Sequence, residues 1–328
     1  MTVGTRPQSS RYLRPAGARP ARPAPPPRAV AAPKLSVVIL NHNSGRMLLD
    51  CVNSLFADDL PFEIEVIIPD NASTDDSVEL TQARWGDRLK VIRNGDNRGF
   101  AWGNNIGIAA CRGEYVCLLN PDTIVRRGCF RALVEFLDAN PRAGFAGPKV
   151  LNPDGSLQLS CRRSIPSPFD AVARALLLSK LFPRNPRLAR YNVCWLDPDV
   201  TQQVDASTGC CMVARRAMLE QIGVLDEGFF IYCEDVDWFL RAKNAGWETW
   251  YVASAVLEHH HAYSAGFRRH RAVADFHRSM VYFYRKHYAG SHPAALNAAI
   301  YASVMARMCL IVCLKGVGEW RSASAAAR

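Results

Sequence analysis

The sequence lacks a C-x-x-C pair and any spacing of histidine and cysteine that is typical of a zinc site. It also lacks a compact apolar segment near its start, where Pro and Arg recur, so no secretory signal is indicated. Eleven cysteines are present, an odd number, and most lie in apolar runs, as Cys117, Cys129 and Cys309 do. We interpret them as reduced thiols packed as small hydrophobic side chains, which favours a cytoplasmic location.

Acidic residues are missing from positions 1–33, where six Arg and eight Pro occur. They are also scarce in 268–328, which has ten Lys or Arg against two acids. The middle segment, 34–267, has 24 basic and 28 acidic side chains, so the net charge of +10 comes from the two ends. We predict a disordered arm at 1–33 and basic, apolar helices at 268–328. Basic ends suit an anionic lipid, a nucleic acid or a phosphate-bearing substrate, and a solvated tail is the alternative.

Buried strands alternate with helices in the first half of the chain. The run at 35–40 is apolar and β-branched with no polar face, as in a strand that is covered on both sides. Similar runs predict strands at 65–68, 89–93 and 115–119, and helical spacing predicts helices at 46–56, from Asp75 onward and at 100–111. This alternation predicts an α/β fold with an open, mostly parallel sheet flanked by helices.

Polar residues follow each of these strands, where ligands bind in such sheets. Asp122 comes after Asn120-Pro121 and is suited to hold a divalent cation with a diphosphate, or alternatively to cap a following helix. Asp70 and Asn71 are suited to a nucleobase or ribose, with an Asx turn as the alternative. Arg98 precedes a predicted helix start, where it is suited to phosphate or is a surface residue. The candidates at these strand ends are Asn41, Asn43, Asp70, Asn71, Arg98 and Asp122.

The second half is less regular. A helix is predicted at 170–182, a strand broken by Gly209 at 204–214, and a strand with three histidines at 252–261. Between them, Glu234, Asp235 and Asp237 begin a helix that runs to Lys243. Crowded acids beside apolar residues tend to have raised pKa values, which suits a general base, although acids at a helix start also offset the helix dipole.

The three histidines, His259, His260 and His261, are candidate metal ligands. Side chains alternate along a strand, so all three cannot face one ion. We therefore expect one functional histidine among them.

Taken together, these segments resemble the family-2 inverting glycosyltransferases, and within them the bacterial rhamnosyltransferase-like branch. The resemblance runs from Leu35 to about Tyr288. The segments that carry it are Val37–Asn43, Asp70–Asp75, Asn97–Asn105, Leu118–Asp122, Gly147–Lys149, Asp154–Ser156, Gly209–Met212, Phe229–Asp237 with Arg241, and His259–Ser264. Each segment is short, but their order and spacing together are specific.

The resemblance implies a GT-A nucleotide-binding domain over 34–267, with a nucleotide-binding half at 34–125 and an acceptor half at 126–267. It implies that Asp122 binds a divalent metal, Mn or Mg, and that His259 contacts this metal directly or from the second coordination sphere. It also implies that Asp235, with Glu234 beside it, activates the acceptor. Asn120 replaces the first acid of a strict D-x-D element. The residues implied for the nucleotide are Asn41, Asn43, Asp70, Asn71, Arg98 and Asn105.

The expected substrates are a nucleotide-diphosphate sugar, first dTDP-L-rhamnose, and a saccharide or lipid-linked saccharide of the cell envelope. The apolar run at 294–318 is long enough to cross a bilayer, but Asn297 and Arg307 favour a core or interfacial helix. We expect peripheral contact of 268–318 with the inner face of the plasma membrane, and no nucleic-acid partner. The alternatives are a nucleotidyltransferase, which usually has a Gly-rich loop after the first strand, and a non-catalytic module that binds anionic lipid or nucleic acid.

Overall fold

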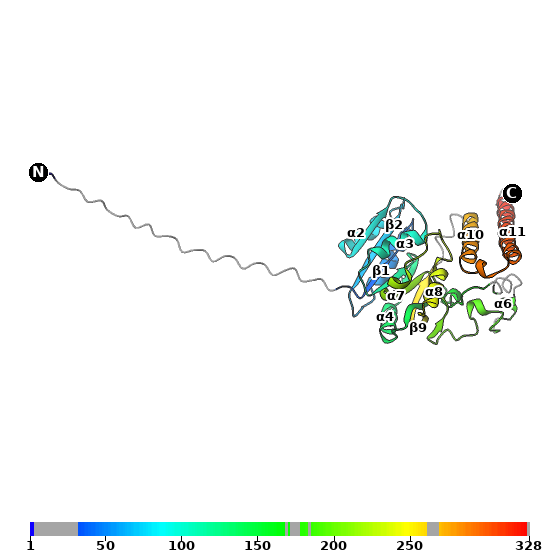
Figure 1. Ribbon diagram of the computed structural model, residues 1–328. Coiled ribbons are helices and arrows are strands. Elements are labelled where there is room, and N and C mark those ends of the chain that lie inside the picture. Colours follow the sequence, from blue (N-terminus) through cyan, green and yellow to red (C-terminus); the bar gives the residue numbers. More distant parts are fainter. Residues whose placement is uncertain (3–31, 168–169, 171–177, 183–184, 261–268, 327–328) are drawn as a thin grey trace. The chain divides into compact units, whose positions relative to one another are not determined.

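The computed structural model describes residues 1–2, 32–167, 170, 178–182, 185–260 and 269–326. Residues Ala32–Arg328 form one compact unit of strands and helices, coloured by sequence in Figure 1. Almost all of the predicted arm at 1–33 lies outside the described residues, and so does most of the predicted helix at 170–182. The described end of that helix is the short α6, Leu178–Leu181.

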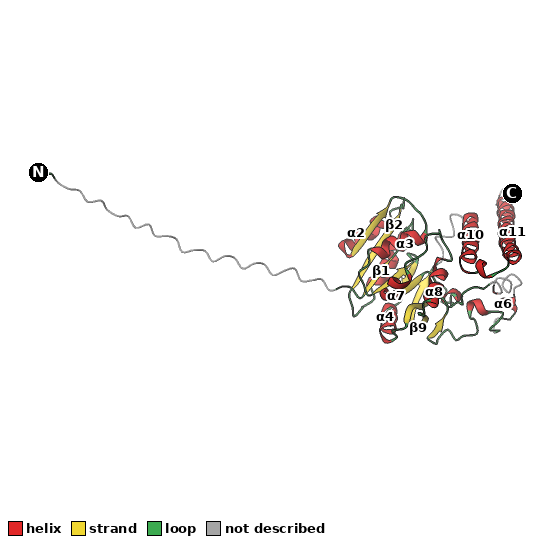
Figure 2. Cartoon of the chain, viewed as in Figure 1, coloured by secondary structure: helices red, strands yellow, loops and turns green. Residues whose placement is uncertain are grey.

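Figure 2 distinguishes the helices, in red, from the strands, in yellow. The strands are β1 Leu35–Val38, β2 Ile64–Asn71, β3 Leu89–Asn94, β4 Tyr115–Leu119, β5 Thr123–Val125, β6 Ala143–Leu151, β7 Gln202–Val204, β8 Cys211–Arg215 and β9 Glu248–His259. The helices are α1 Arg46–Phe56, α2 Ser77–Trp85, α3 Phe100–Ala109, α4 Cys129–Ala139, α7 Arg216–Ile222, α8 Glu234–Asn244, α10 Arg269–His287 and α11 Ala294–Ala326.

The described strands form one mixed sheet in the order β3-β2-β1-β4-β8-β6-β9-β5, with β7 also paired to β9. The strands β3, β2, β1 and β4 are all parallel, as predicted for the first half. Beyond β4 the pairing changes, because β8 runs antiparallel to both β4 and β6. The carboxyl ends of the parallel strands therefore meet the turn at the start of β8.

Two strand predictions in the second half are corrected. The strand expected at 204–214, broken by Gly209, is two separate strands with different partners, since β7 pairs with β9 and β8 pairs with β4 and β6. The segment between them turns away from the sheet, with Gly209 packed near Asp235. The strand expected at 252–261 is β9, which begins earlier at Glu248 and ends at His259. His260 follows the strand, and His261 lies outside the described residues.

Alternation along the strands builds one apolar core on each face of the sheet. In β4, Cys117 and Leu119 face the core that contains α1, α2 and α4. Val116 and Leu118, from the same strand, face the core that contains α3, α7 and α8. The sheet is thus covered on both faces, which explains why its strands read as continuous apolar runs.

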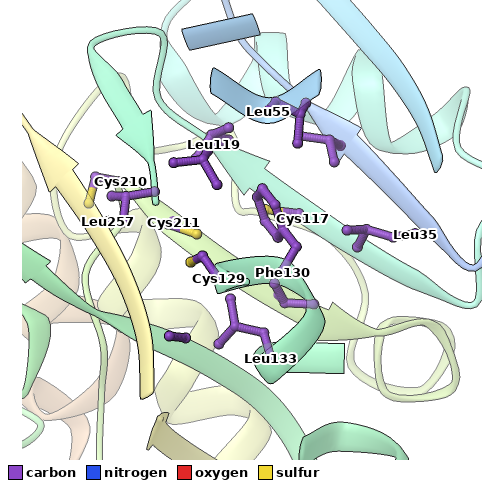
Figure 3. Packing of buried hydrophobic residues seen from close by; sticks show 14 of the residues in the cluster. Leu35, Leu55, Cys117, Leu119, Cys129, Phe130, Leu133, Cys210, Cys211 and Leu257 are labelled. Atoms are coloured by element: carbon purple, nitrogen blue, oxygen red, sulfur yellow. The ribbon is translucent and has the colours of Figure 1, made fainter. Parts of the chain in front are cut away.

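Cysteines contribute to the first of these cores. Cys117, Cys129, Cys210 and Cys211 lie among Leu35, Leu119, Phe130 and other apolar side chains in Figure 3. All eleven cysteines of the chain are free. Burial raises the pKa of the Cys117 and Cys129 thiols well above its usual range. The interpretation of the cysteines as small packed hydrophobic side chains is confirmed for Cys117 and Cys129. It is wrong for Cys309, which is exposed on α11.

Two glycines let α3 lie close to the sheet. A Cβ atom on Gly103 would come 2.7 Å from Asn71 Oδ1, and one on Gly107 would overlap Val38. The helix therefore packs its backbone against the ends of β1 and β2, next to the candidate nucleotide-binding residues.

Candidate active site

The carboxyl ends of β1 and β2 bring Asn41 and Asp70 together. Asn41 Nδ2 donates to Asp70 Oδ1 at 2.7 Å, and Ser73 Oγ donates to the same oxygen at 2.5 Å. Asn41 is 0% and Asp70 2% exposed. The Ser73 amide also donates to Asp70 Oδ2 at 3.3 Å, so the turn expected as an alternative role for Asp70 is present. We call Asn41, Asn43, Asp70 and Asn71 the donor-side cluster.

The other two members of the donor-side cluster hold neighbouring loops. Asn43 adopts a left-handed backbone, φ 53, and its Oδ1 accepts from the Thr74 amide at 2.7 Å. Asn71 Nδ2 donates to Gly99 O at 3.1 Å, and Asn94 Nδ2 donates to Asn71 Oδ1 at 2.8 Å. These amides thus fix the backbone on either side of Asp70 before any ligand binds.

Arg98 lies just before α3, and Asn105 lies within it. Arg98 is exposed, and its guanidinium stacks on Trp102 at 5.0 Å from the ring centroid. The first amide of α3, on Phe100, donates to Phe230 O at 2.6 Å, so a protein carbonyl already occupies part of the helix start that was expected to attract phosphate. Asn105 Nδ2 donates to Leu225 O at 2.9 Å and so holds the loop that leads to α8.

Asp122 lies beside His259, although the two are far apart in sequence. The antiparallel register of β5 on β9 places Thr123 opposite His259. As a result Asp122 Oδ1 is 3.2 Å from His259 Nε2, and the His260 amide donates to Asp122 O at 2.9 Å. The element after Asp122 is the strand β5, so Asp122 does not cap a helix as the alternative proposed.

The surroundings of His259 suit a metal ligand. Its Nδ1 lies 3.1 Å from Gln158 Oε1, which orients the ring and points Nε2 at Asp122. A ligating histidine usually has such a partner on its second nitrogen. Burial opposes charge on this ring, but Cys210 and Asp122 outweigh burial and raise the pKa of His259 to about 10. A divalent cation held here would displace the proton from His259 Nε2, and Asp122 and the neutral imidazole would then be its protein ligands.

The three acids at the start of α8, which we call the acidic turn, lie in different environments. The two residues before them, Tyr232 and Cys233, have φ 70 and 67, a strained backbone that is often found at functional sites. Burial, followed by the charge of Asp235, raises the pKa of Glu234 to about 8. The raised pKa expected for this acidic turn is therefore confirmed for Glu234.

Asp237 contradicts that expectation. Burial opposes its ionisation, but hydrogen bonds from His287, Lys286 and Arg241 lower the pKa of Asp237 to about 2. Asp237 Oδ1 lies 2.7 Å from His287 Nε2 and 2.6 Å from Lys286 Nζ, and Asp237 Oδ2 lies 2.8 Å from Arg241 Nε. Asp237 therefore joins α8 to α10 as a structural anion.

Asp235 forms a buried ion pair that the sequence did not predict. Arg163 Nη2 donates to Asp235 Oδ2 at 2.5 Å, and the Val236 amide donates to Oδ1 at 2.8 Å. Arg163 and Gln158 were both missed as site residues. The sequence contains one weak signal, the two consecutive Arg at 162–163 in a segment with apolar neighbours. No local pattern links that segment to α8.

Solved structures share this fold. A mannosyltransferase from Pyrobaculum calidifontis in complex with GDP-Man and Mn2+ has a TM-score of 0.55 and 18% identity, over 91% of this chain and 77% of that one. GalNAc-T7 with UDP, GalNAc and Mn2+ has a TM-score of 0.56 and 16% identity, over 78% of this chain and 48% of that one. The curled, mixed sheet is that of GT-A glycosyltransferases, and the GT-A fold predicted from the sequence is confirmed.

The particular family follows from the sequence relatives. Residues 36–191 match the family described as Glycosyl transferase family 2. The chain is 32% identical to an N-acetylglucosaminyl-diphospho-decaprenol L-rhamnosyltransferase of Mycobacterium tuberculosis, over 85% of this chain and 92% of the relative. It is 26% identical to the rhamnosyltransferase WbbL of Escherichia coli strain K12, over 71% and 88%. The chain belongs to glycosyl transferase family 2, and it is an enzyme of nucleotide-sugar transfer in cell-envelope synthesis.

Proposed function

We propose that the enzyme transfers L-rhamnose from dTDP-L-rhamnose to the sugar hydroxyl of a lipid-linked N-acetylglucosamine, with inversion at the anomeric carbon. The names of the relatives support this choice of sugar and acceptor. The observation that carries the chemistry is the buried carboxylate of Asp235, which accepts from Arg163 and from the Val236 amide at the start of α8. One positioned base without a protein nucleophile favours a single in-line displacement.

In this proposal the acceptor O–H gives its proton to Asp235 while its oxygen bonds to the anomeric carbon. The bond from that carbon to the diphosphate oxygen breaks, and the electron pair leaves with the nucleoside diphosphate. Base catalysis of this kind typically contributes a factor of about 10²–10⁴. The donor-side cluster would hold the nucleotide, with Asp70 accepting from the base or ribose, Arg98 meeting phosphate and Asn105 positioning the loop beside it.

A divalent metal, Mn or Mg, fits the pair of Asp122 and His259. When bound there, such an ion neutralises negative charge on the leaving diphosphate. Relatives of the same fold were solved with Mn2+, in the two complexes described above. Within the described residues no group of three or more metal-binding side chains is found, so the donor diphosphate would complete the coordination.

Nucleotide binding tests this part of the proposal directly. A ligand that binds only the folded state raises the melting temperature. With Mn2+ present, dTDP should raise it more than UDP or GDP, and the shift should be lost in Asp122→Asn. The matched control is Asp154→Asn, an exposed acid whose carboxylate bonds only within its own turn, to Ser156. Equal shifts for all three nucleotides, or a shift that survives Asp122→Asn, would contradict the assignment.

The same proposal includes peripheral membrane contact through α11. Among the described residues, Ala294–Cys313 is a 20-residue stretch that is long and apolar enough to cross a bilayer, and its most apolar part is not buried. This exposure favours an interfacial helix over a core helix for 294–313. The polar residues Asn297 and Arg307 contact Tyr284 and His277 of α10, while Leu296, Met305 and Leu310 are exposed.

Binding to vesicles checks this contact. The chain should sediment with vesicles that contain anionic lipid, and Met305→Glu with Leu310→Glu should release it. Leu159→Glu, another exposed apolar residue far from α11 in sequence, is the control. Sedimentation that is unchanged by the α11 substitutions would contradict membrane contact through this helix.

A further inference from the structure

The ion pair on Asp235 is more deeply buried than most ion pairs of this protein. The Arg163 and Asp235 side chains are 11% and 9% exposed. The guanidinium lies on the second oxygen of Asp235, and the Val236 amide occupies the first. Both oxygens of the proposed base therefore have a donor before the acceptor arrives.

Arg163 is held in place independently of Asp235. Its backbone pairs with Ala206 through two hydrogen bonds of 2.8 and 2.9 Å. Its Nε donates to Ser207 O at 3.1 Å, and its Nη1 lies 3.4 Å from the Tyr191 hydroxyl. A planar guanidinium fixed in this way presents its charge in one direction, toward the acidic turn.

Glu234, the neighbour of Asp235, has no comparable partner. It is 5% exposed, and within the described part of the chain its Oε2 has no hydrogen-bond partner. Burial and the adjacent charge of Asp235 raise the pKa of Glu234 to about 8. Two neighbouring carboxyls thus lie in opposite environments, a pattern that separates an ionised group from a protonated one.

The other groups around this pair do not compete for the charge. Asp237 is neutralised by Arg241 of its own helix and by Lys286 and His287 of α10. The Cys233 thiol and the Tyr232 hydroxyl face the pair, and burial raises the pKa of both, so both are neutral. Asp275 of α10 acts on Tyr232, and Tyr191 contacts Arg163. Arg163 is therefore the cation that faces the acidic pair among the described residues.

We propose that Arg163 is a positioning residue that keeps the negative charge of the acidic pair on Asp235 and leaves the proton on Glu234. The inference rests on the proposed function, because it explains how one of two adjacent carboxyls becomes the base. Without this guanidinium, burial would favour a shared proton, and Asp235 would spend part of its time unable to accept one from the acceptor hydroxyl.

Infrared spectroscopy tests the placement of the proton without any substrate. At about pH 7 the band of a protonated carboxyl should be present in the wild type, lost in Glu234→Gln and kept in Asp235→Asn. In an Arg163→Met background, Glu234→Gln and Asp235→Asn should each decrease the band, because the proton is then shared between the two carboxyls. A band that depends on Glu234 alone in the Arg163→Met background would overturn the proposal.

The pH profile of sugar transfer tests the consequence. Arg163→Met should lower the rate about tenfold at about pH 7, and the loss should diminish as the pH rises. Arg163→Lys retains the charge and should restore most of the rate. This variant controls for a loss of rate in Arg163→Met that is caused by misfolding. Arg162→Met is the matched control, because Arg162 is also buried but bonds to Leu196 O and stacks on Tyr251. That control should lower the rate equally at every pH, if at all.

A failure of the role of Arg163 can be distinguished from a failure of Asp235 as the base. A loss in Arg163→Met that is the same at every pH would overturn the role of Arg163. If Asp235→Asn retains full transfer while the infrared result is as expected, the base assignment in the proposed function fails instead, and the placement of the proton by Arg163 stands.

Discussion

The donor-side cluster and the acidic turn both lie at buried ends of secondary-structure elements, but they are stabilised differently. In the donor-side cluster each polar group bonds mainly to amides and hydroxyls of neighbouring turns, as Asp70 does with Asn41 and Ser73. In the acidic turn, full charges are buried, Asp235 and Asp237 are paired with cations, and Glu234 has an oxygen without a partner. The polar groups of the donor-side cluster thus have mostly uncharged partners, whereas the acidic turn holds two carboxylates in buried ion pairs beside a third that has an oxygen without a partner.

The largest stability effect is expected at Asp237. Asp237→Asn leaves Lys286, His287 and Arg241 around a neutral group, and breaking a buried ion pair costs about 3–5 kcal/mol. Since the folded pKa of Asp237 is about 2, below its ordinary value of 3.8, its contribution is complete above about pH 4 and is lost as the pH falls toward about 2. Urea unfolding between these pH values measures both effects.

The control for that measurement is Asp275→Asn. Its partners Arg271 and Arg278 are 55% and 77% exposed, so the change should cost about 0–1 kcal/mol. Equal costs for the two substitutions would remove the distinction between a structural anion in the acidic turn and an ordinary surface pair.

The next effect concerns the metal. Chelation of the divalent ion, or Asp122→Asn, should lower transfer by about 10²–10³-fold, because charge on the leaving diphosphate is no longer neutralised. The measurement is the transfer rate after dialysis against a chelator and again after Mn2+ is restored. Full activity without a divalent ion would show that the donor-side cluster and Arg98 suffice for the diphosphate.

A third prediction uses the raised pKa of Glu234. The folded protein holds a proton on Glu234 between about pH 4.5 and about pH 8, so the free energy of unfolding should fall as the pH rises through that range. Glu234→Gln has no such proton, and its stability relative to the wild type should increase by about 1.4 kcal/mol for each pH unit within the range. Parallel pH curves for the two proteins would contradict a protonated Glu234.

The smallest effect is expected in the donor-side cluster. Asp70→Asn keeps an acceptor oxygen for Asn41 and Ser73 but loses the charge, which should cost about 1 kcal/mol of unfolding free energy. The variant should nevertheless weaken the melting-temperature shift with dTDP if Asp70 contacts the nucleotide. A loss of unfolding free energy as large as that of Asp237→Asn would show that Asp70 also acts as a buried, paired anion.

Local patterns explain which parts could be predicted. The strands β1, β2, β3 and β4 follow from apolar runs, because both of their faces are covered, and parallel pairing follows from the helices between them. The two strands within 202–215 could not be predicted as separate, because an apolar run does not show that its two ends pair with different strands. The prediction that the acidic turn begins a helix at Glu234 is confirmed, since acids favour a helix start.

Contacts between distant segments explain what was not predicted. Asp122 and His259 were both selected, but their proximity depends on the register of β5 on β9. Arg163 reaches Asp235 because its backbone pairs with Ala206, a contact that leaves no periodic signal in the sequence. The different pKa values of Glu234 and Asp237 depend in the same way on α10, which supplies cations to only one of them.

The central claim is that Asp235 is the base of an inverting rhamnosyl transfer. The most direct test is the rate of rhamnose transfer from dTDP-rhamnose to lipid-linked N-acetylglucosamine by the wild type and by Asp235→Asn, with the configuration of the product determined. The account predicts a product with inverted configuration and a loss of about 10²–10⁴-fold in Asp235→Asn, with the dTDP-induced melting shift unchanged. A product with retained configuration, or an Asp235→Asn variant as fast as the wild type, would contradict it.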